Sequence, residues 1–202
     1  MGKQIKSLVL ANPSANVSRT AYTVPSGKYA VAKSVTISNS STTDLKFRLI
    51  IGGAYVAYDH TLKGKDTLAI NDLDIPLLPG ETIIIMASSA SCFFKVSGFE
   101  DDYVSSEYPY LKVNAIPVTV AASITKDSDM IIRSVIICNT SGTTTTSIFL
   151  DAPSTLVNKD IKPNDSLLLL NFQYFISKNE NIVHRQSSTG GMMTFVLEKV
   201  GD

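Results

Sequence analysis

The chain has 202 residues, and its 18 Lys and Arg balance 18 Asp and Glu, so the formal net charge is zero. That length fits one large domain or two domains of about 100 residues, each long enough to bury a hydrophobic core. Because phosphate binding requires a concentrated basic surface, the balanced charge and the lack of any Lys/Arg run argue against nucleic acid as the main partner.

The N-terminal segment carries a short apolar stretch at residues 8–11, followed by Asn12 and Pro13. This stretch is too short for a signal-peptide core or a membrane span. The chain begins Met-Gly, but Lys6 stands where a myristoylation signal requires Ser or Thr. We therefore expect a protein that is made in the cytoplasm, has no signal peptide and does not associate with membranes.

Two stretches that lie one hundred residues apart are similar: "KSVTISNS" begins at Lys33 and "RSVIICNT" begins at Arg133. The register continues downstream with one residue less, because "LKGKDTLAI" and "PGETI" of the first half align with "IKPNDSLLL" and "KNENI" of the second. We place the missing residue in a variable loop between Gly52 and His60. Self-similarity at a fixed period predicts an internal duplication.

The two copies are joined by "DDYVSSEYPY", residues 101–110, which contains three acids before Pro109. A polar stretch of this kind is typical of a linker. We place the N-terminal domain at residues 1–103 and the C-terminal domain, a divergent repeat of the first, at residues 104–202.

Apolar residues alternate with polar ones, or form short apolar runs rich in Val, Ile and Phe, in segments of strand length. In chain order these predicted strands are residues 33–39, 47–51, 67–71, 82–86, 93–99, 133–139, 166–170 and 193–200. Turn residues separate them at the spacing of a sandwich or barrel. The sequence predicts an all-β protein of two tandem antiparallel β-sandwiches, with either jelly-roll or immunoglobulin-like connectivity.

The first half also resembles a known family. It has a "YTVPSG" start at Tyr22, a strand ending in "SNS", an "LPGET" turn from Leu78 and a closing "VSG" strand. This pattern resembles accessory structural proteins of tailed bacteriophages, which are neck, tail or capsid-associated parts of the virion. The second half departs from it, with "TKDSD" and "SKNEN" at the two turns. The resemblance implies a building block and transfers no catalytic residue.

The residues that could carry chemistry are few. His60 and His184 have no G-x-S-x-G motif to accompany them, so we interpret them as loop or strand-surface residues. Cys92 and Cys138 form no metal-binding spacing and are interpreted as two buried thiols, although a disulfide between them stays open. We predict no catalytic, cofactor-binding or metal site, no cofactor, and no enzymatic activity.

A calcium site is the alternative to the prediction of no metal site, because loop carboxylates can bind calcium. The candidates are two Asp-x-Asp pairs, Asp72/Asp74 and Asp127/Asp129. Neither pair has the EF-hand pattern, and they lie at non-equivalent places in the two halves. Turn-capping aspartates are therefore the preferred interpretation.

Tyrosines form the candidate interaction surface. Tyr55 and Tyr58 lie near the variable loop, and Tyr108 and Tyr110 lie in the linker. Exposed tyrosines supply a large contact area at small entropic cost, so they suit a protein partner or a sugar ring. The alternative is ordinary packing at the ends of the sandwiches and between the two domains.

These observations favour a non-enzymatic structural protein of a tailed-phage virion. We expect it to dock onto the capsid, neck or tail through protein–protein contacts, to bind other virion proteins and to assemble as a homo-oligomer or in several symmetric copies. The competing hypothesis is a host-surface adhesin that binds carbohydrate through Tyr55 and Tyr58. A hydrolase is the least favoured, because no nucleophile, base and orienting group can be assembled.

Overall fold

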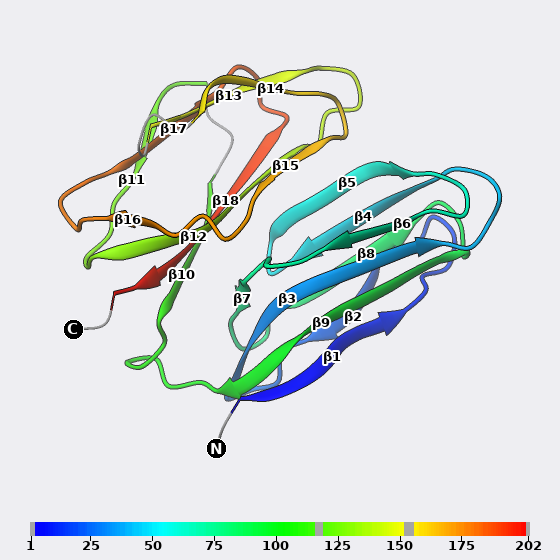
Figure 1. Cartoon of the computed structure of the whole chain (residues 1–202), viewed down its shortest axis with the longest axis horizontal. Coiled ribbons are helices and arrows are strands. Elements are labelled where there is room, and N and C mark those ends of the chain that lie inside the picture. The colour runs from blue at the N-terminus through cyan, green and yellow to red at the C-terminus, as the bar shows by residue number, and fades with distance from the viewer. Residues whose placement is uncertain (1–2, 116–118, 152–155, 201–202) are drawn as a thin grey trace. The chain divides into compact units, whose positions relative to one another are not determined.

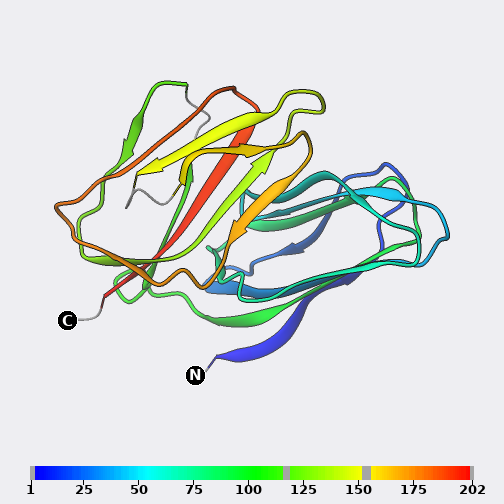
Figure 2. The same cartoon turned by 45° about the horizontal axis from the view of Figure 1, so that its top comes forward.

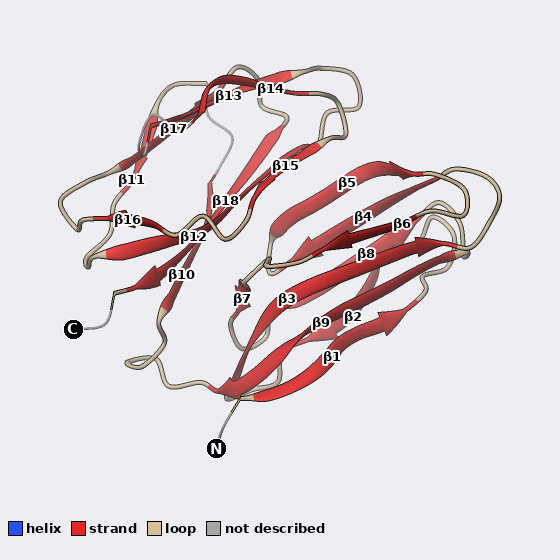
Figure 3. Cartoon of the chain, viewed as in Figure 1, coloured by secondary structure: helices blue, strands red, loops and turns tan. Residues whose placement is uncertain are grey.

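The computed structural model describes residues 3–115, 119–151 and 156–200. The chain divides into two compact units, Met1–Tyr108 and Pro109–Asp202. All regular secondary structure in the described ranges is β-strand, which confirms the all-β prediction (Figures 1 and 3). Within those ranges no helix is long and apolar enough to cross a membrane.

The first unit is built from nine strands. They are β1 (Gln4–Ala11), β2 (Arg19–Thr23), β3 (Lys28–Asn39), β4 (Leu45–Ile51), β5 (Ala54–Leu62), β6 (Thr67–Ile70), β7 (Ile75–Leu77), β8 (Thr82–Ala87) and β9 (Cys92–Asp102).

The described residues of the second unit form a second set of strands. They are β10 (Tyr110–Ala115), β11 (Ala122–Ile124), β12 (Met130–Asn139), β13 (Thr146–Asp151), β14 (Leu156–Ile161), β15 (Ser166–Leu169), β16 (Tyr174–Ile176), β17 (Ile182–Gln186) and β18 (Gly191–Lys199).

The strand order is the same in both units. The first unit has sheets β1-β9-β3-β6 and β2-β8-β4-β5, and the second has β10-β18-β12-β15 and β11-β17-β13-β14. β7 pairs with β3 beside β6, as β16 pairs with β12 beside β15, so each of these pairs acts as one interrupted strand. Two four-position antiparallel sheets in this order make an eight-stranded jelly roll. The predicted duplication is confirmed, and the connectivity is jelly-roll rather than immunoglobulin-like.

Each unit is a sandwich of two strand layers, which Figure 2 shows from a second direction. In the first unit the core lies between the layers, where the inward residues of β4 and β8 include Phe47, Leu49, Ile83 and Ile85, all at most 1% exposed. These strands alternate strictly between buried and half-exposed positions, which is why their sequences predict them.

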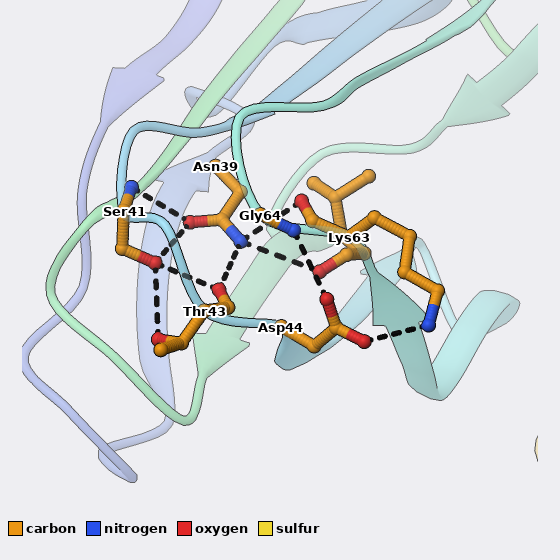
Figure 4. Close-up of polar contacts among 7 residues, drawn as sticks. Asn39, Ser41, Thr43, Asp44, Lys63 and Gly64 are labelled. Carbon is orange, nitrogen blue, oxygen red and sulfur yellow. Dashed lines mark hydrogen bonds and ion pairs between the residues drawn. The ribbon is translucent and has the colours of Figure 1, made fainter.

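The repeated asparagines tie loops together. The Asn39 side chain, which is 2% exposed, donates Nδ2 hydrogen bonds to the carbonyls of Thr43 (2.8 Å) and Lys63 (3.0 Å), while its Oδ1 accepts the Ser41 N–H (Figure 4). Asn139 donates hydrogen bonds to the Thr144 and Ile161 carbonyls at 2.8 and 3.0 Å, and the Ile161 bond corresponds to the 3.3 Å bond from Asn39 to the Leu62 carbonyl. One buried carboxamide in each unit therefore joins the loop before β4 or β13 to the end of β5 or β14.

Other recurring residues also serve the fold. Glu81 accepts the Leu78 N–H at 2.7 Å, and Glu180 accepts the Ser177 N–H at 2.8 Å, so the "PGE" and "KNE" turns close in the same way. Lys33 and Arg133 both lie at a register shift where β3 or β12 bulges against its neighbour. The similarity of the two halves thus records structural requirements of the jelly roll.

Two expectations require correction. The predicted variable loop between Gly52 and His60 is strand β5, and the chain turns only at Gly52 and Gly53, whose φ angles are positive. β5 escaped prediction because two register shifts against β4 place Val56 and Ala57 side by side in the core and so destroy the period of two. The predicted boundary at residue 103 precedes the observed division, because the linker packs on the first unit.

Candidate interaction surface

Tyr55 and Tyr58 lie on β5, an edge strand of the sheet β2-β8-β4-β5. Their ring centroids are 5.9 Å apart. The Arg48 guanidinium lies 4.0 Å from the centroid of the Tyr58 ring and donates two hydrogen bonds to Asp59, at 2.6 and 2.8 Å. The structure thus brings the two predicted tyrosines together and adds a cation that sequence reasoning missed.

A bulge creates this arrangement. Phe47 pairs with His60 and Leu49 pairs with Ala57, so Tyr58 and Asp59 together oppose Arg48. Asp59 takes a positive φ of 50°, a conformation that Asp tolerates better than most residues. Hydrogen bonding to Arg48 lowers the pKa of the Asp59 carboxyl, although its partial burial opposes that change. The bidentate pair therefore holds Arg48 over the Tyr58 ring.

Apolar side chains continue this surface over the outer face of the sheet, the face directed away from the core of the first unit. Ile50 of β4 pairs with Tyr55 on one side and Ile84 on the other, and Arg48 pairs with Met86. All are half-buried, and they alternate with core residues. We call this set the tyrosine face; its members are Arg48, Ile50, Tyr55, Tyr58, Ile84 and Met86.

The other sheet has an exposed apolar edge. Ile5 and Leu10 of the edge strand β1 are 87% and 80% exposed, and Phe93 of β9 is 49% exposed. Leu10 pairs with Lys95, so Phe93, two residues away, is its diagonal neighbour across the strands. We call Ile5, Leu10 and Phe93 the β1 edge. Sequence reasoning missed it because a bulge at Leu8 interrupts the alternation of β1.

Tyr108 and Tyr110 lie in other segments of the chain than Tyr55 and Tyr58. Tyr108 packs edge-on against Tyr29 and Tyr103, with centroids 5.3 and 5.4 Å apart, so it holds the linker against the first unit. Tyr110 begins β10 in the second unit, where it pairs with Glu198. For Tyr108 the packing alternative describes its contacts; an interaction role for Tyr108 and Tyr110 stays a prediction.

A buried carboxylate links three strands of the first unit. Glu100 of β9, whose side chain is 8% exposed, forms an ion pair with Lys6 of β1 at 2.8 Å and accepts a hydrogen bond from the Tyr22 hydroxyl of β2. Burial raises the pKa of Glu100, but the hydrogen bonds from Lys6 and Tyr22 together lower it by more than burial raises it. The net shift of the pKa is therefore downward. Burial and Glu100 raise the pKa of Tyr22. This is a structural network across the sandwich, since all its members are mutually satisfied.

The histidines occupy two environments. His60 on β5 is half-buried, and its ring lies 5.5 Å from that of Phe47. His184 on β17 is 4% exposed and faces the core of the second unit, so its interpretation as a strand-surface residue was wrong. The error arose because inward positions of a strand are usually apolar, so a polar residue at an inward position is mistaken for an outward, exposed one.

The Asp-x-Asp pairs and the two cysteines make contacts within the fold. Asp74 forms an ion pair with Lys33, and Asp129 accepts the Lys178 N–H at 2.7 Å. No three His, Cys, Asp or Glu residues among the described ones are grouped to hold a metal ion. Cys92 and Cys138 are both buried and form no disulfide, as the buried-thiol interpretation predicts. Burial raises the pKa of Cys92 to about 12, which makes the thiol unreactive.

A small hollow of about 240 Å³ lies in the second unit, lined by Thr119, Ser147, Phe149, Arg185, Gln186 and Ser187. Arg185 covers Phe149 at 4.9 Å from its ring centroid. Pockets for drug-sized ligands usually measure about 300–1,000 Å³. The surfaces of the first unit are therefore the stronger candidates for function.

No protein-family model matches the chain, and no curated protein matches it. Among solved structures, the major capsid protein P2 from Bacteriophage PM2 is 12% identical, with a TM-score of 0.35 over 99% of this chain and 98% of that one. A structure from Sulfolobus Turreted Icosahedral Virus is 8% identical, with a TM-score of 0.24 over 96% of this chain and 58% of that one.

A salicylate 1,2-dioxygenase from Pseudoaminobacter salicylatoxidans aligns as well, at 6% identity and a TM-score of 0.26 over 96% of this chain and 70% of that one. These low scores span virion proteins and an enzyme, so they assign no function. The assignment of the jelly roll rests on the strand order of this chain.

Proposed function

We propose that this chain is a non-enzymatic structural protein of a virus particle, which assembles with copies of itself or with other particle proteins. The observation that carries the proposal is the pair of jelly rolls of the same strand order with open sheet edges, the first of which presents apolar side chains at an edge and over an outer face. Jelly rolls build viral capsids, but also lectins and cupins, so the fold alone does not decide among these roles.

The tyrosine face supports a protein partner. The fully buried centres of protein interfaces are enriched in Tyr, Met and Arg and depleted in Lys and Glu. Tyr and Arg are also common among the residues that contribute most to binding. Tyr55, Tyr58, Arg48 and Met86 match that composition, and the Arg48–Asp59 pair holds its arginine in place before any partner arrives.

The β1 edge supports assembly by a second route. Edge strands with free backbone groups and exposed apolar side chains pair readily with other chains, and soluble monomers usually protect them. On β1, Ile5 and Leu10 project outward with nearly their full surface exposed. Pairing of this edge with another strand would bury both side chains and satisfy the backbone of β1.

The finer role, docking on the capsid, neck or tail of a tailed phage, is part of the proposal. Its sequence basis is the set of turn motifs, and Gly27, Gly80 and Glu81 have turn-forming roles, with positive φ at both glycines and a turn-closing hydrogen bond at Glu81. Such motifs suit any jelly roll, so by themselves they do not distinguish a shell protein from an accessory one.

Analysis of particles tests the proposal. We expect mass spectrometry of virus particles from the source culture, purified by density gradient, to find the chain in a fixed ratio to the other structural proteins. The chain should stay with the particles through a second gradient. Its absence from purified particles, while it is abundant in the lysate, would refute the proposal.

Carbohydrate binding is the second candidate, favoured by the adjacent rings of Tyr55 and Tyr58. The position of Arg48 over Tyr58 counts against it, because one face of that ring is already occupied. A glycan array with the purified chain decides between the two. Binding that Tyr58→Ala abolishes would support an adhesin, whereas an empty array leaves protein assembly as the function.

A further inference from the structure

β17 and β8 occupy the same place in their jelly rolls but have different inward side chains. In β8 the inward residues Ile83, Ile85 and Ala87 are fully buried and apolar. In β17 the inward residues are Ile182, His184 and Gln186, which are 0%, 4% and 2% exposed. The second unit therefore has polar groups in its core where the first has an isoleucine and an alanine.

Flanking hydrogen bonds support this equivalence. The Ser88 hydroxyl, just after β8, accepts the Lys46 N–H at 2.9 Å, and the Ser187 hydroxyl, just after β17, accepts the Ser147 N–H at 2.8 Å. The strand after each hydroxyl-bearing turn is β9 or β18, which completes the same sheet order. Ile85 and His184 are thus corresponding core positions.

Several polar atoms of this core have no hydrogen-bond partner among the described residues. His184 Nδ1, both polar atoms of the Gln186 carboxamide and the Thr146 hydroxyl are buried and make no hydrogen bond. Gln186 Oε1 lies so close to Gly191 that a Cβ there would meet it at 1.9 Å. A buried polar group without a partner costs free energy, so this core is already weakened before any change of charge.

Among the described side chains on the strands that contact His184, none supplies a negative charge to it. Its ring lies 5.9 Å from the Phe195 ring of β18, and its backbone neighbours are Ala122 of β11 and Leu150 of β13. Among described side chains, the charged ones on these strands point elsewhere: Arg185 is exposed over Phe149, Glu198 pairs with Arg133, and Lys199 is exposed. Asp151 of β13 lies outside the residues whose side chains are described.

We propose that the second jelly roll is an acid-sensitive unit: protonation of the buried His184 opens it under mildly acidic conditions in which the first jelly roll stays closed. Burial lowers the pKa of His184 in the folded unit below its ordinary value. The unfolded chain then binds more protons than the folded one, so stability is complete above the ordinary histidine pKa of about 6.5 and falls as the pH drops below it.

Hydrogen exchange of the full chain tests this. Between about pH 7.5 and about pH 5.5, a histidine that stays neutral only in the folded state raises the opening equilibrium by up to about tenfold. We expect the protection factors of β17 and β18 to fall by several-fold, while those of β8 and β9 change little. An equal response of both units would overturn the proposal.

Two exchanged variants provide the matched control. His184→Ile should remove the acid response of the second unit, and Ile85→His should confer one on the first. An acid response that persists in His184→Ile overturns the proposal. In the wild-type chain, an NMR titration should also show a His184 pKa below its ordinary value in the folded unit; an ordinary or raised pKa in a closed unit would contradict the proposal even if neither variant folds.

Discussion

Polar side chains at single positions hold the loops of each jelly roll in place. Asn39 and Asn139 donate hydrogen bonds to the Lys63 and Ile161 carbonyls, and Glu81 and Glu180 close the turns before β8 and β17. Buried carbonyls left without a donor are costly, so a single carboxamide controls two loops at once. The sequence repeat located these residues, but only the structure explains why they recur.

Removal of the Asn39 side chain should therefore destabilise the first unit. We expect Asn39→Ala to lower the free energy of unfolding by about 1–3 kcal/mol, because the Thr43 and Lys63 carbonyls lose their donor. Urea denaturation followed by circular dichroism measures the change. Asn71→Ala, at an exposed loop position, is the control and should have little effect; equal losses in both variants would contradict this role.

Gly98 is a second position where one atom matters. A Cβ at this residue of β9 would lie 2.0 Å from the Val31 carbonyl oxygen of β3, so the backbones must separate to admit it. We expect Gly98→Ala to cost about 1–3 kcal/mol, the range for overpacked cores. A thermal melt should show a lower Tm. Gly142→Ala, where nothing lies within 4 Å, should leave the Tm unchanged.

At the scale of elements, regular alternation decides what sequence reasoning can find. The predicted strands at residues 33–39, 82–86 and 133–139 are parts of β3, β8 and β12, whose inward positions are consistently apolar. β1 and β5 were missed because bulges interrupt their period. These bulged edge strands carry the β1 edge and part of the tyrosine face, so the surfaces proposed for assembly were the hardest elements to predict.

The contact of β1, β2 and β9 through Glu100 predicts an acid response of the first unit. The folded-state pKa of Glu100 is lowered, so its stabilising effect is complete above the ordinary value of about 4.3 and is lost as the pH falls through the folded-state value. This window lies below that of His184. Glu100→Gln should cost about 1.5–3 kcal/mol at neutral pH and flatten the stability curve of the first unit in strong acid.

Urea midpoints of wild type and Glu100→Gln, measured from neutral pH down to strong acid, provide the test. The two curves should converge as the pH falls. If they remain parallel, the Lys6–Glu100–Tyr22 network does not control the acid stability of the first unit. Glu107→Gln, in the exposed linker, serves as the control for the loss of a carboxylate.

At the scale of the whole molecule, duplication produced two jelly rolls of one topology that have diverged in chemistry. The first has an apolar core along β8 and carries the proposed assembly surfaces, whereas the second has polar groups along β17. The all-β class and the duplication followed from the sequence, because strand period and repeat register are local. The pairing of distant edge strands and the inward direction of His184 depend on contacts between distant segments and were not predictable.

Sedimentation velocity of the purified chain over a wide concentration range tests assembly most directly, with the double variant Ile5→Lys/Leu10→Lys beside the wild type. Both side chains are almost fully exposed, so the variant should keep the wild-type urea midpoint. We predict concentration-dependent oligomers for the wild type and a shift toward monomer for the variant, because charged side chains block pairing of an edge strand. A wild-type chain that stays monomeric at every concentration, or a variant that assembles equally well, would contradict assembly through this edge.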